Sequence, residues 1–146
     1  MKYISRRPEE TMEIGFRLGG LLKEGDIVAV YGDLGAGKTT MVKGIASALD
    51  IDEREIASAS FTVIAEYDTI PPFRHIDLYR IEKGAELDEL GLWDVIGDDS
   101  ISVIEWAEKV EEFLPEDIIK VRIKSFGENL REIVIEGIDE KNWDNL

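Results

Sequence analysis

The 146-residue chain contains no cysteine. It can therefore form neither a disulfide framework nor a thiolate metal site, which fits a reducing compartment. It contains one histidine, His75, and a lone histidine cannot form a metal cluster. No apolar run has membrane length, and the basic residues after Met1 are not followed by the apolar segment of a secretion signal. We expect a cytoplasmic protein that contacts no membrane.

Basic residues are few, with 17 Lys and Arg against 32 Asp and Glu, and the formal charge is −15. This charge repels polyphosphate backbones at long range, so direct, autonomous nucleic-acid binding is disfavoured. The acidity serves either solubility alone or a docking surface for a basic protein partner. With 44% apolar residues and no linker or repeat, residues 1–146 are expected to form one domain.

One stretch, Gly32–Thr40, fits the P-loop pattern G-x-x-x-x-G-K-[ST]. A strand-length apolar run precedes it, and apolar residues at helical spacing follow it. Its glycines let backbone N–H groups turn inward, and the helix start adds the positive end of a dipole, so the loop would cradle phosphates. We expect Lys38 to neutralise the β- and γ-phosphates and Thr39 to offer its hydroxyl to Mg²⁺. The expected nucleotide contacts are Asp33, Leu34, Gly35, Ala36, Gly37, Lys38, Thr39 and Thr40.

A P-loop also needs carboxylates that hold Mg²⁺ and order a water, and two strand ends supply them. Glu105 follows the apolar run 101–104 in the manner of a Walker B acid, and Asp77 closes the run 73–76 in the same way. Strand alternation places His75 on the same face as Asp77. Plainer interpretations stay open: an exposed strand-end glutamate, a turn-capping aspartate and a structural histidine.

Other residues admit both a functional and a plain interpretation. Ser58, Ser60 and Thr62 resemble a switch segment that touches the γ-phosphate or the metal, or they form a polar turn. Trp106 is either a core residue or a nucleotide-stacking residue, and in both cases a natural optical reporter. The guanine-recognition motif N-K-x-D does not occur, and the nearest match, at 141–144, has its residues in another order. This favours ATP over GTP as the nucleotide.

Periodicity and turn signals predict an α/β fold. In the first half of the chain we expect a helix over 8–22, the P-loop strand and helix, and a hairpin around 70–72 that includes a strand over 73–79. In the second half we expect two short helices in 85–97 broken at Gly91, a buried strand over 101–104, and an antiparallel pair of strands over 118–124 and 131–136. Together they predict a P-loop NTPase-like three-layer fold, whose mixed sheet has parallel core strands and antiparallel edge hairpins.

Four motifs, taken in order, resemble the TsaE (YjeE) family of small P-loop ATPases: the P-loop at Gly32–Thr40, the hydroxyl-rich segment 58–62, H-x-D-L-Y-R at His75–Arg80, and Glu105-Trp106. The resemblance covers essentially the whole chain. It implies a bacterial cytoplasmic protein needed for the threonylcarbamoyladenosine modification of tRNA. Such a protein would act with TsaD, which transfers the threonylcarbamoyl group, and with TsaB, its inactive-site paralogue, and would reach tRNA only through that complex.

The resemblance also implies roles for single residues. ATP would bind at the P-loop, with Mg²⁺ held by Thr39 and Glu105, and Asp77 would be a further catalytic or metal-linked carboxylate. Thr11 and Arg131 would lie near the nucleotide, although no local motif supports them.

The chain departs from the family at 58–61, where Ser-Ala-Ser-Phe replaces the usual S-P-T-F. Ala59 lacks the fixed φ of proline, so the loop would be looser.

The motifs favour an ATPase that uses Lys38, Asp77 and Glu105 to drive or reset a partner complex. Two alternatives stay open. A nucleotide-gated binding module would use ATP only to fix its shape. A small-molecule kinase would need an acceptor pocket and usually an arginine-bearing lid, neither of which is recognisable in the sequence. Self-association is left open as well.

Overall fold

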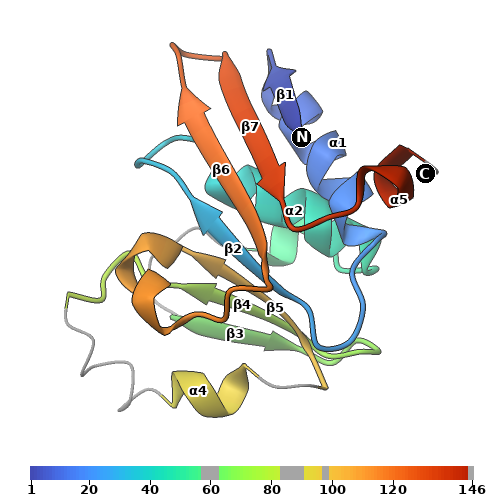
Figure 1. Cartoon of the computed structure of the whole chain (residues 1–146), viewed down its shortest axis with the longest axis vertical. Helices are drawn as coiled ribbons and strands as arrows, with labels where there is room; N and C mark the ends of the chain where they lie inside the picture. The colour runs from blue at the N-terminus through green and yellow to red at the C-terminus, as the bar shows by residue number, and fades with distance from the viewer. Residues whose placement is uncertain (57–62, 83–90, 97–98, 145–146) are drawn as a thin grey trace.

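The computed structural model describes residues 1–56, 63–82, 91–96 and 99–144 (Figure 1). The strands are β1 Lys2–Ser5, β2 Ile27–Tyr31, β3 Ile64–Tyr67, β4 Phe73–Asp77, β5 Ile101–Glu105, β6 Ile119–Ser125 and β7 Arg131–Glu136. The helices are α1 Pro8–Gly19, α2 Lys38–Ala48, α4 Leu92–Val95 and α5 Glu140–Asp144, with short 3-10 turns η1 Glu53–Glu55, η2 Ala107–Lys109 and η3 Glu111–Phe113.

The described strands form one sheet in the order β1-β7-β6-β2-β5-β4-β3. Strands β6, β2, β5 and β4 are parallel, whereas β7 and β1 at one edge and β3 at the other are antiparallel. The expected mixed sheet is therefore confirmed. The parallel strands all have their carboxyl ends on the same side of the sheet, so the loops that follow them meet there. At these carboxyl ends, Glu105 is paired in register with Val30 of β2 and with Asp77 of β4.

Structure covers both faces of the sheet, as the three-layer prediction requires. Helices α1 and α2 lie together on one face, where their apolar side chains join those of the sheet in the larger core (Figure 1). On the other face, Leu92 of α4 and Ala107 of η2 pack with Ala29, Ile76 and Ile104. Strand β2 is thus covered on both faces, which explains why it appears in the sequence as an unbroken apolar run.

Some element boundaries differ from the prediction. The first helix ends at Gly19 rather than at 22. Strand β4 ends at Asp77 rather than at 79, because the Asp77 carboxylate accepts a hydrogen bond from the Tyr79 N–H and the chain turns. The predicted break at Gly91 is confirmed, since Gly91 has φ 68° and precedes α4, while 83–90 lie outside the described residues.

Strand β1 and helix α5 are not predicted by the sequence pattern. Strand β1 has four residues and, among the described strands, pairs only with β7, and α5 has five residues. Elements this short carry too little periodicity to be recognised. Among the described residues, none of the helices has the length and apolar character needed to span a membrane.

Candidate functional site

The P-loop joins the carboxyl end of β2 to the start of α2. Gly35 and Gly37 have φ 79° and 104°, left-handed conformations that glycine adopts without strain. Lys38, the first residue of α2, is buried, and its ammonium donates to the carbonyl oxygens of Gly32 at 2.5 Å and Asp33 at 2.8 Å. The Lys38 Nζ also lies 3.9 Å from the centre of the Trp106 ring. The lysine is therefore folded back over its own loop.

Glu105, the last residue of β5, reaches the P-loop from the neighbouring strand. It is only 2% exposed, and both of its carboxylate oxygens are engaged. Thr39 Oγ1 donates to Oε1 at 3.0 Å, and a 2.5 Å hydrogen bond joins His75 Nε2 to Oε2. Ligand atoms of His75, Asp77 and Glu105 all lie within 4.8 Å of one another. Two neighbouring strand ends thus place two carboxylates beside the P-loop threonine.

Burial shifts the pKa of two charged groups in this cluster. It raises the pKa of Asp77, and the nearby negative charge of Glu105 raises it further, against the hydrogen bond from the Tyr79 N–H. Burial lowers the pKa of Lys38, whereas the carboxylates of Glu105 and Glu108 act in the opposite direction. A cation would relieve the repulsion between the carboxylates, and a polyanion would compensate the buried ammonium. The charges therefore suit a metal ion and a phosphate chain together.

A cavity of about 370 Å³ opens over this cluster. It is lined by Leu34, Gly35, Gly37, Lys38, Thr39, Thr40, Asp77, Tyr79, Glu105 and Trp106. A second cavity of about 120 Å³ shares Gly35, Gly37 and Thr40 with it and extends to Thr11 and Arg131. The P-loop thus has a recess on each side, and together the recesses are of the size that small-molecule sites have.

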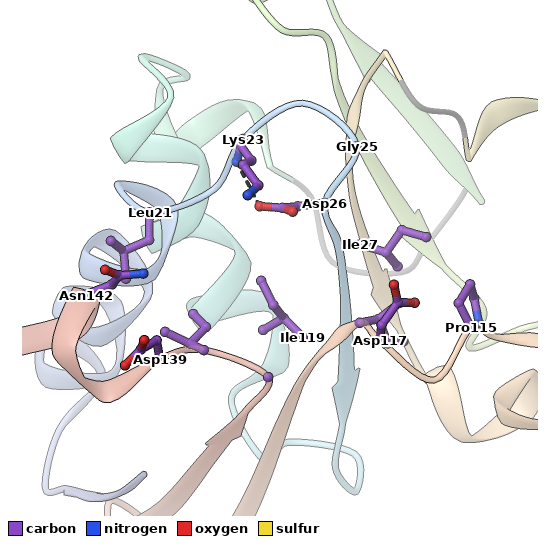
Figure 2. Close-up of a pocket in the computed structure, with 13 residues that line it drawn as sticks. Leu21, Lys23, Gly25, Asp26, Ile27, Pro115, Asp117, Ile119, Asp139 and Asn142 are labelled. Atoms are coloured by element: carbon purple, nitrogen blue, oxygen red, sulfur yellow. Dashed lines mark hydrogen bonds between the residues drawn. The ribbon is translucent and has the colours of Figure 1, made fainter.

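A larger cavity of about 510 Å³ lies at the amino ends of the parallel strands, away from the P-loop. It opens between the starts of β2 and β6 and the end of β7 (Figure 2). Its lining includes Asp26, Asp117, Asp139 and Lys23, and the Lys23 N–H donates to the Asp26 carboxylate at 2.9 Å. It contains none of the motif residues. Although it is the larger cavity, it is not where the chemistry-bearing side chains converge.

The structure brings together most of the residues that the sequence singled out. Lys38, Thr39, Asp77 and Glu105 line one cavity, and Thr11 and Arg131 line its smaller neighbour. Asp33 Oδ atoms form no hydrogen bond among the described residues, and its carbonyl accepts from Lys38. The hydroxyl-rich positions 58, 60 and 62 lie outside the described residues.

Three contacts at the site escaped the sequence analysis. Glu108 accepts a long hydrogen bond of 3.4 Å from the Gly32 N–H. Tyr79 lines the larger recess and packs against Trp106, with ring centres 5.4 Å apart. Arg131 donates to carbonyls of the P-loop itself. Only Tyr79 carried a signal, as part of the motif His75–Arg80.

The comparisons with known proteins all point to one family. The family model described as "Threonylcarbamoyl adenosine biosynthesis protein TsaE" matches residues 5–133. A "tRNA threonylcarbamoyladenosine biosynthesis protein TsaE" of Bacillus subtilis (strain 168) is 38% identical over 142 residues, which cover 97% of this chain and 88% of the relative. A protein of the same name from Treponema pallidum (strain Nichols) is 36% identical over 135 residues, 92% of this chain and 99% of the relative.

A solved structure has the same fold. The "Crystal structure of Bacillus subtilus YdiB" superposes with a TM-score of 0.72 and 36% sequence identity, and the match covers 97% of this chain and 88% of that one. The family model covers the P-loop and both strand-end carboxylates, and the curated relatives match almost the full chain. The chain therefore belongs to the TsaE family of tRNA threonylcarbamoyladenosine biosynthesis proteins.

Proposed function

We propose that the chain is a Mg²⁺-dependent ATPase that serves the threonylcarbamoyladenosine modification of tRNA in the cytoplasm, together with TsaB and TsaD. One observation carries the proposal. A P-loop lysine and threonine share one cavity with two buried strand-end carboxylates, Asp77 and Glu105. A P-loop alone binds phosphates, whereas the added carboxylates supply what hydrolysis needs, a metal site and a group that orients water.

The oxygen atoms at the site suit Mg²⁺, which prefers hydroxyl, carboxylate and phosphate oxygens. Thr39 Oγ1 and Glu105 Oε1 already lie 3.0 Å apart, so both can contribute to one coordination shell. When bound, the ion would neutralise charge on the phosphates. His75 is not needed as a ligand, because its Nε2 is engaged with Glu105 and holds that carboxylate in place.

The remaining residues would bind ATP and prepare the attacking water. Lys38 would exchange the carbonyls of Gly32 and Asp33 for phosphate oxygens, a better match for an ammonium. The raised pKa of Asp77 makes its carboxylate a stronger base, so it is suited to accept a proton from a water aligned against the terminal phosphate.

The charge of the whole chain supports a protein as the immediate partner. At −15, the chain repels the tRNA backbone at long range, although tRNA modification is the process for which the family is named. Contact with tRNA would therefore be made through TsaB and TsaD rather than by this chain.

The test is Mg-ATP hydrolysis by the purified chain, alone and with the TsaB–TsaD pair. We expect turnover to rise sharply with the pair. Lys38→Ala should abolish it, whereas Lys43→Ala, on the same helix but outside the cavity lining, should leave it unchanged. ATP binding without turnover in either setting would instead support a nucleotide-gated module, and transfer of phosphate to a metabolite would support a kinase.

A further inference from the structure

The guanidinium of Arg131, the first residue of β7, donates all of its hydrogen bonds to main-chain carbonyls. A guanidinium has five N–H donors, and all five are used. The accepting oxygens are those of Ala36 at 2.9 Å from Nε, Gly35 at 3.2 Å and Glu128 at 3.1 Å from Nη2, and Gly127 at 2.8 Å and Leu130 at 3.0 Å from Nη1. Two of these carbonyls belong to the P-loop and three to the turn between β6 and β7. One side chain thus joins two loops that lie about 95 residues apart in sequence.

The part of the P-loop before Ala36 is exposed and loosely packed. Leu34 is 72% exposed, and no described atom lies within 4 Å of a Cβ built at Gly35. Gly35 and Gly37 are also the residues with the most conformational freedom. Ala36 itself is buried in the core, and its N–H donates to the Asp33 carbonyl at 3.0 Å. The hydrogen bonds from Arg131 act together with this anchor and fix the carbonyls of Gly35 and Ala36, which it leaves free to turn.

The direction of these carbonyls decides the direction of the neighbouring amides. In a planar trans peptide the C=O and the following N–H point to opposite sides. A guanidinium that holds the Ala36 carbonyl on the outer side of the loop thereby turns the Gly37 N–H away from Arg131. Phosphate binding by a P-loop depends on amides that converge on one side, so the loop conformation and the phosphate affinity are linked.

We propose that Arg131 is a positioning residue for phosphate binding, which fixes the P-loop from its outer side and ties it to the β6–β7 turn. It acts through the loop, because in the nucleotide-free structure all five of its donors are engaged with carbonyls. The proposal rests on the proposed function only in taking phosphate as the ligand. It adds a role within the P-loop to the expectation that Arg131 lies near the nucleotide.

The experiment compares Arg131→Lys and Arg131→Ala with the matched exchange Arg122→Lys. Arg122 lies on the paired strand β6 and forms ion pairs with Glu111 and Glu136. Lysine keeps the positive charge but has a single nitrogen, which cannot span two loops as the planar guanidinium does. Amide hydrogen exchange is measured in the nucleotide-free protein, and Mg-ATP affinity is measured by calorimetry.

We expect both Arg131 variants to exchange about tenfold faster in 33–37 and in 126–130, and to bind Mg-ATP about tenfold more weakly. The strands and Arg122→Lys should behave as wild type. Wild-type ATP affinity in Arg131→Lys would show that charge alone suffices and would overturn the proposal. Faster exchange confined to 126–130 would also overturn it, because the arginine would then hold only its own turn.

The two proposals fail in different ways. If the wild-type chain binds no ATP, the proposed function fails, while the exchange rates in 33–37 still decide whether Arg131 fixes the loop. If the wild type binds ATP and the Arg131 variants bind it equally well, only the role of Arg131 fails.

Discussion

Glu105 is held in position from two sides before any ligand binds. Thr39 donates to one carboxylate oxygen and His75 is bonded to the other, and the side chain is 2% exposed. A carboxylate that is buried and doubly bonded has few rotamers left, so it is preorganised for the metal ion that the proposed function requires. The contact of His75 is therefore structural, and it orients the carboxylate to which we assign the metal ion.

Asp77 is a residue whose ionisation costs stability. Its folded-state pKa is raised by burial and by Glu105, so above the ordinary value of 3.8 the native chain binds more protons at this site than the unfolded chain does. The contribution of Asp77 to stability therefore falls as the pH rises from 3.8 through the folded-state pKa. We predict that Asp77→Asn raises the free energy of unfolding at pH 7 and loses ATP turnover. Asparagine can still accept the Tyr79 N–H hydrogen bond.

Denaturant unfolding of wild type and Asp77→Asn at pH 7 and at about pH 3.5 checks this prediction. The gain in stability should be present at pH 7 and much smaller at the lower pH, which lies below 3.8, so that the wild-type carboxyl is mostly protonated in both states. A variant that is less stable than wild type at pH 7 would contradict it.

Trp106 should report nucleotide binding. Its ring lies 3.9 Å from the Lys38 ammonium, which has to leave the ring environment to reach a phosphate. We predict a change in tryptophan fluorescence when Mg-ATP is added, and no change in Trp106→Phe. Trp143 and Trp93 pack against Tyr3 and Phe113, respectively, away from the residues that line the recess. A full response in Trp106→Phe would show that the signal comes from another tryptophan.

At the scale of elements, α1 and α2 approach each other through glycines. A Cβ at Gly44 of α2 would collide with the main-chain carbonyl of Met12 in α1. Because backbone cannot give way as a flexible side chain can, Gly44→Ala should push the helices apart. We predict a loss of about 2 kcal/mol of unfolding free energy, or about 4–8 °C in melting temperature for a chain of this size.

Gly20→Ala is the matched control for Gly44→Ala. Gly20 has φ −68°, and a Cβ there meets its nearest atom at an ordinary 3.5 Å. Thermal unfolding of the two variants should show a clear loss for Gly44→Ala and little change for Gly20→Ala. Equal effects would mean that helix propensity, rather than contact between the helices, determines the stability at both sites.

How well the elements could be predicted depended on whether their signals were local. The P-loop, its strand and its helix were recognisable because motif, apolar run and helical spacing lie in one stretch. Asp77 and Glu105 were predicted because each carboxylate closes an apolar strand, and parallel strands have their carboxyl ends on the same side of a sheet. The contact of Arg131 with Gly35 and Ala36 could not be predicted from local pattern, because it depends on the order β7-β6-β2 in the sheet. The bonds between His75, Glu105 and Thr39 depend on side-chain conformations that periodicity does not encode.

At the scale of the molecule, the acidic charge is only partly compensated. Ion pairs such as Lys2–Glu132 at 3.5 Å and Arg54–Asp52 at 2.6 Å involve largely exposed basic groups. Solvent screens such exposed pairs, so they add little to stability, and the 32 acidic residues outnumber the 17 basic ones. The carboxylates in excess repel one another more strongly in the compact state than in the unfolded chain.

Salt should therefore stabilise this protein at neutral pH. Raising NaCl from about 0.02 M to about 0.3 M shortens the screening length from roughly 20 Å to roughly 6 Å, which weakens repulsion across the surface. We predict that the melting temperature rises by a few degrees at pH 7, and that the rise disappears near the isoelectric pH of about 4.4, where the net charge vanishes. Thermal unfolding across this salt series at both pH values checks it. A melting temperature that falls with salt at pH 7 would mean that local ion pairs outweigh the net repulsion, so the acidity would then stabilise rather than strain the fold.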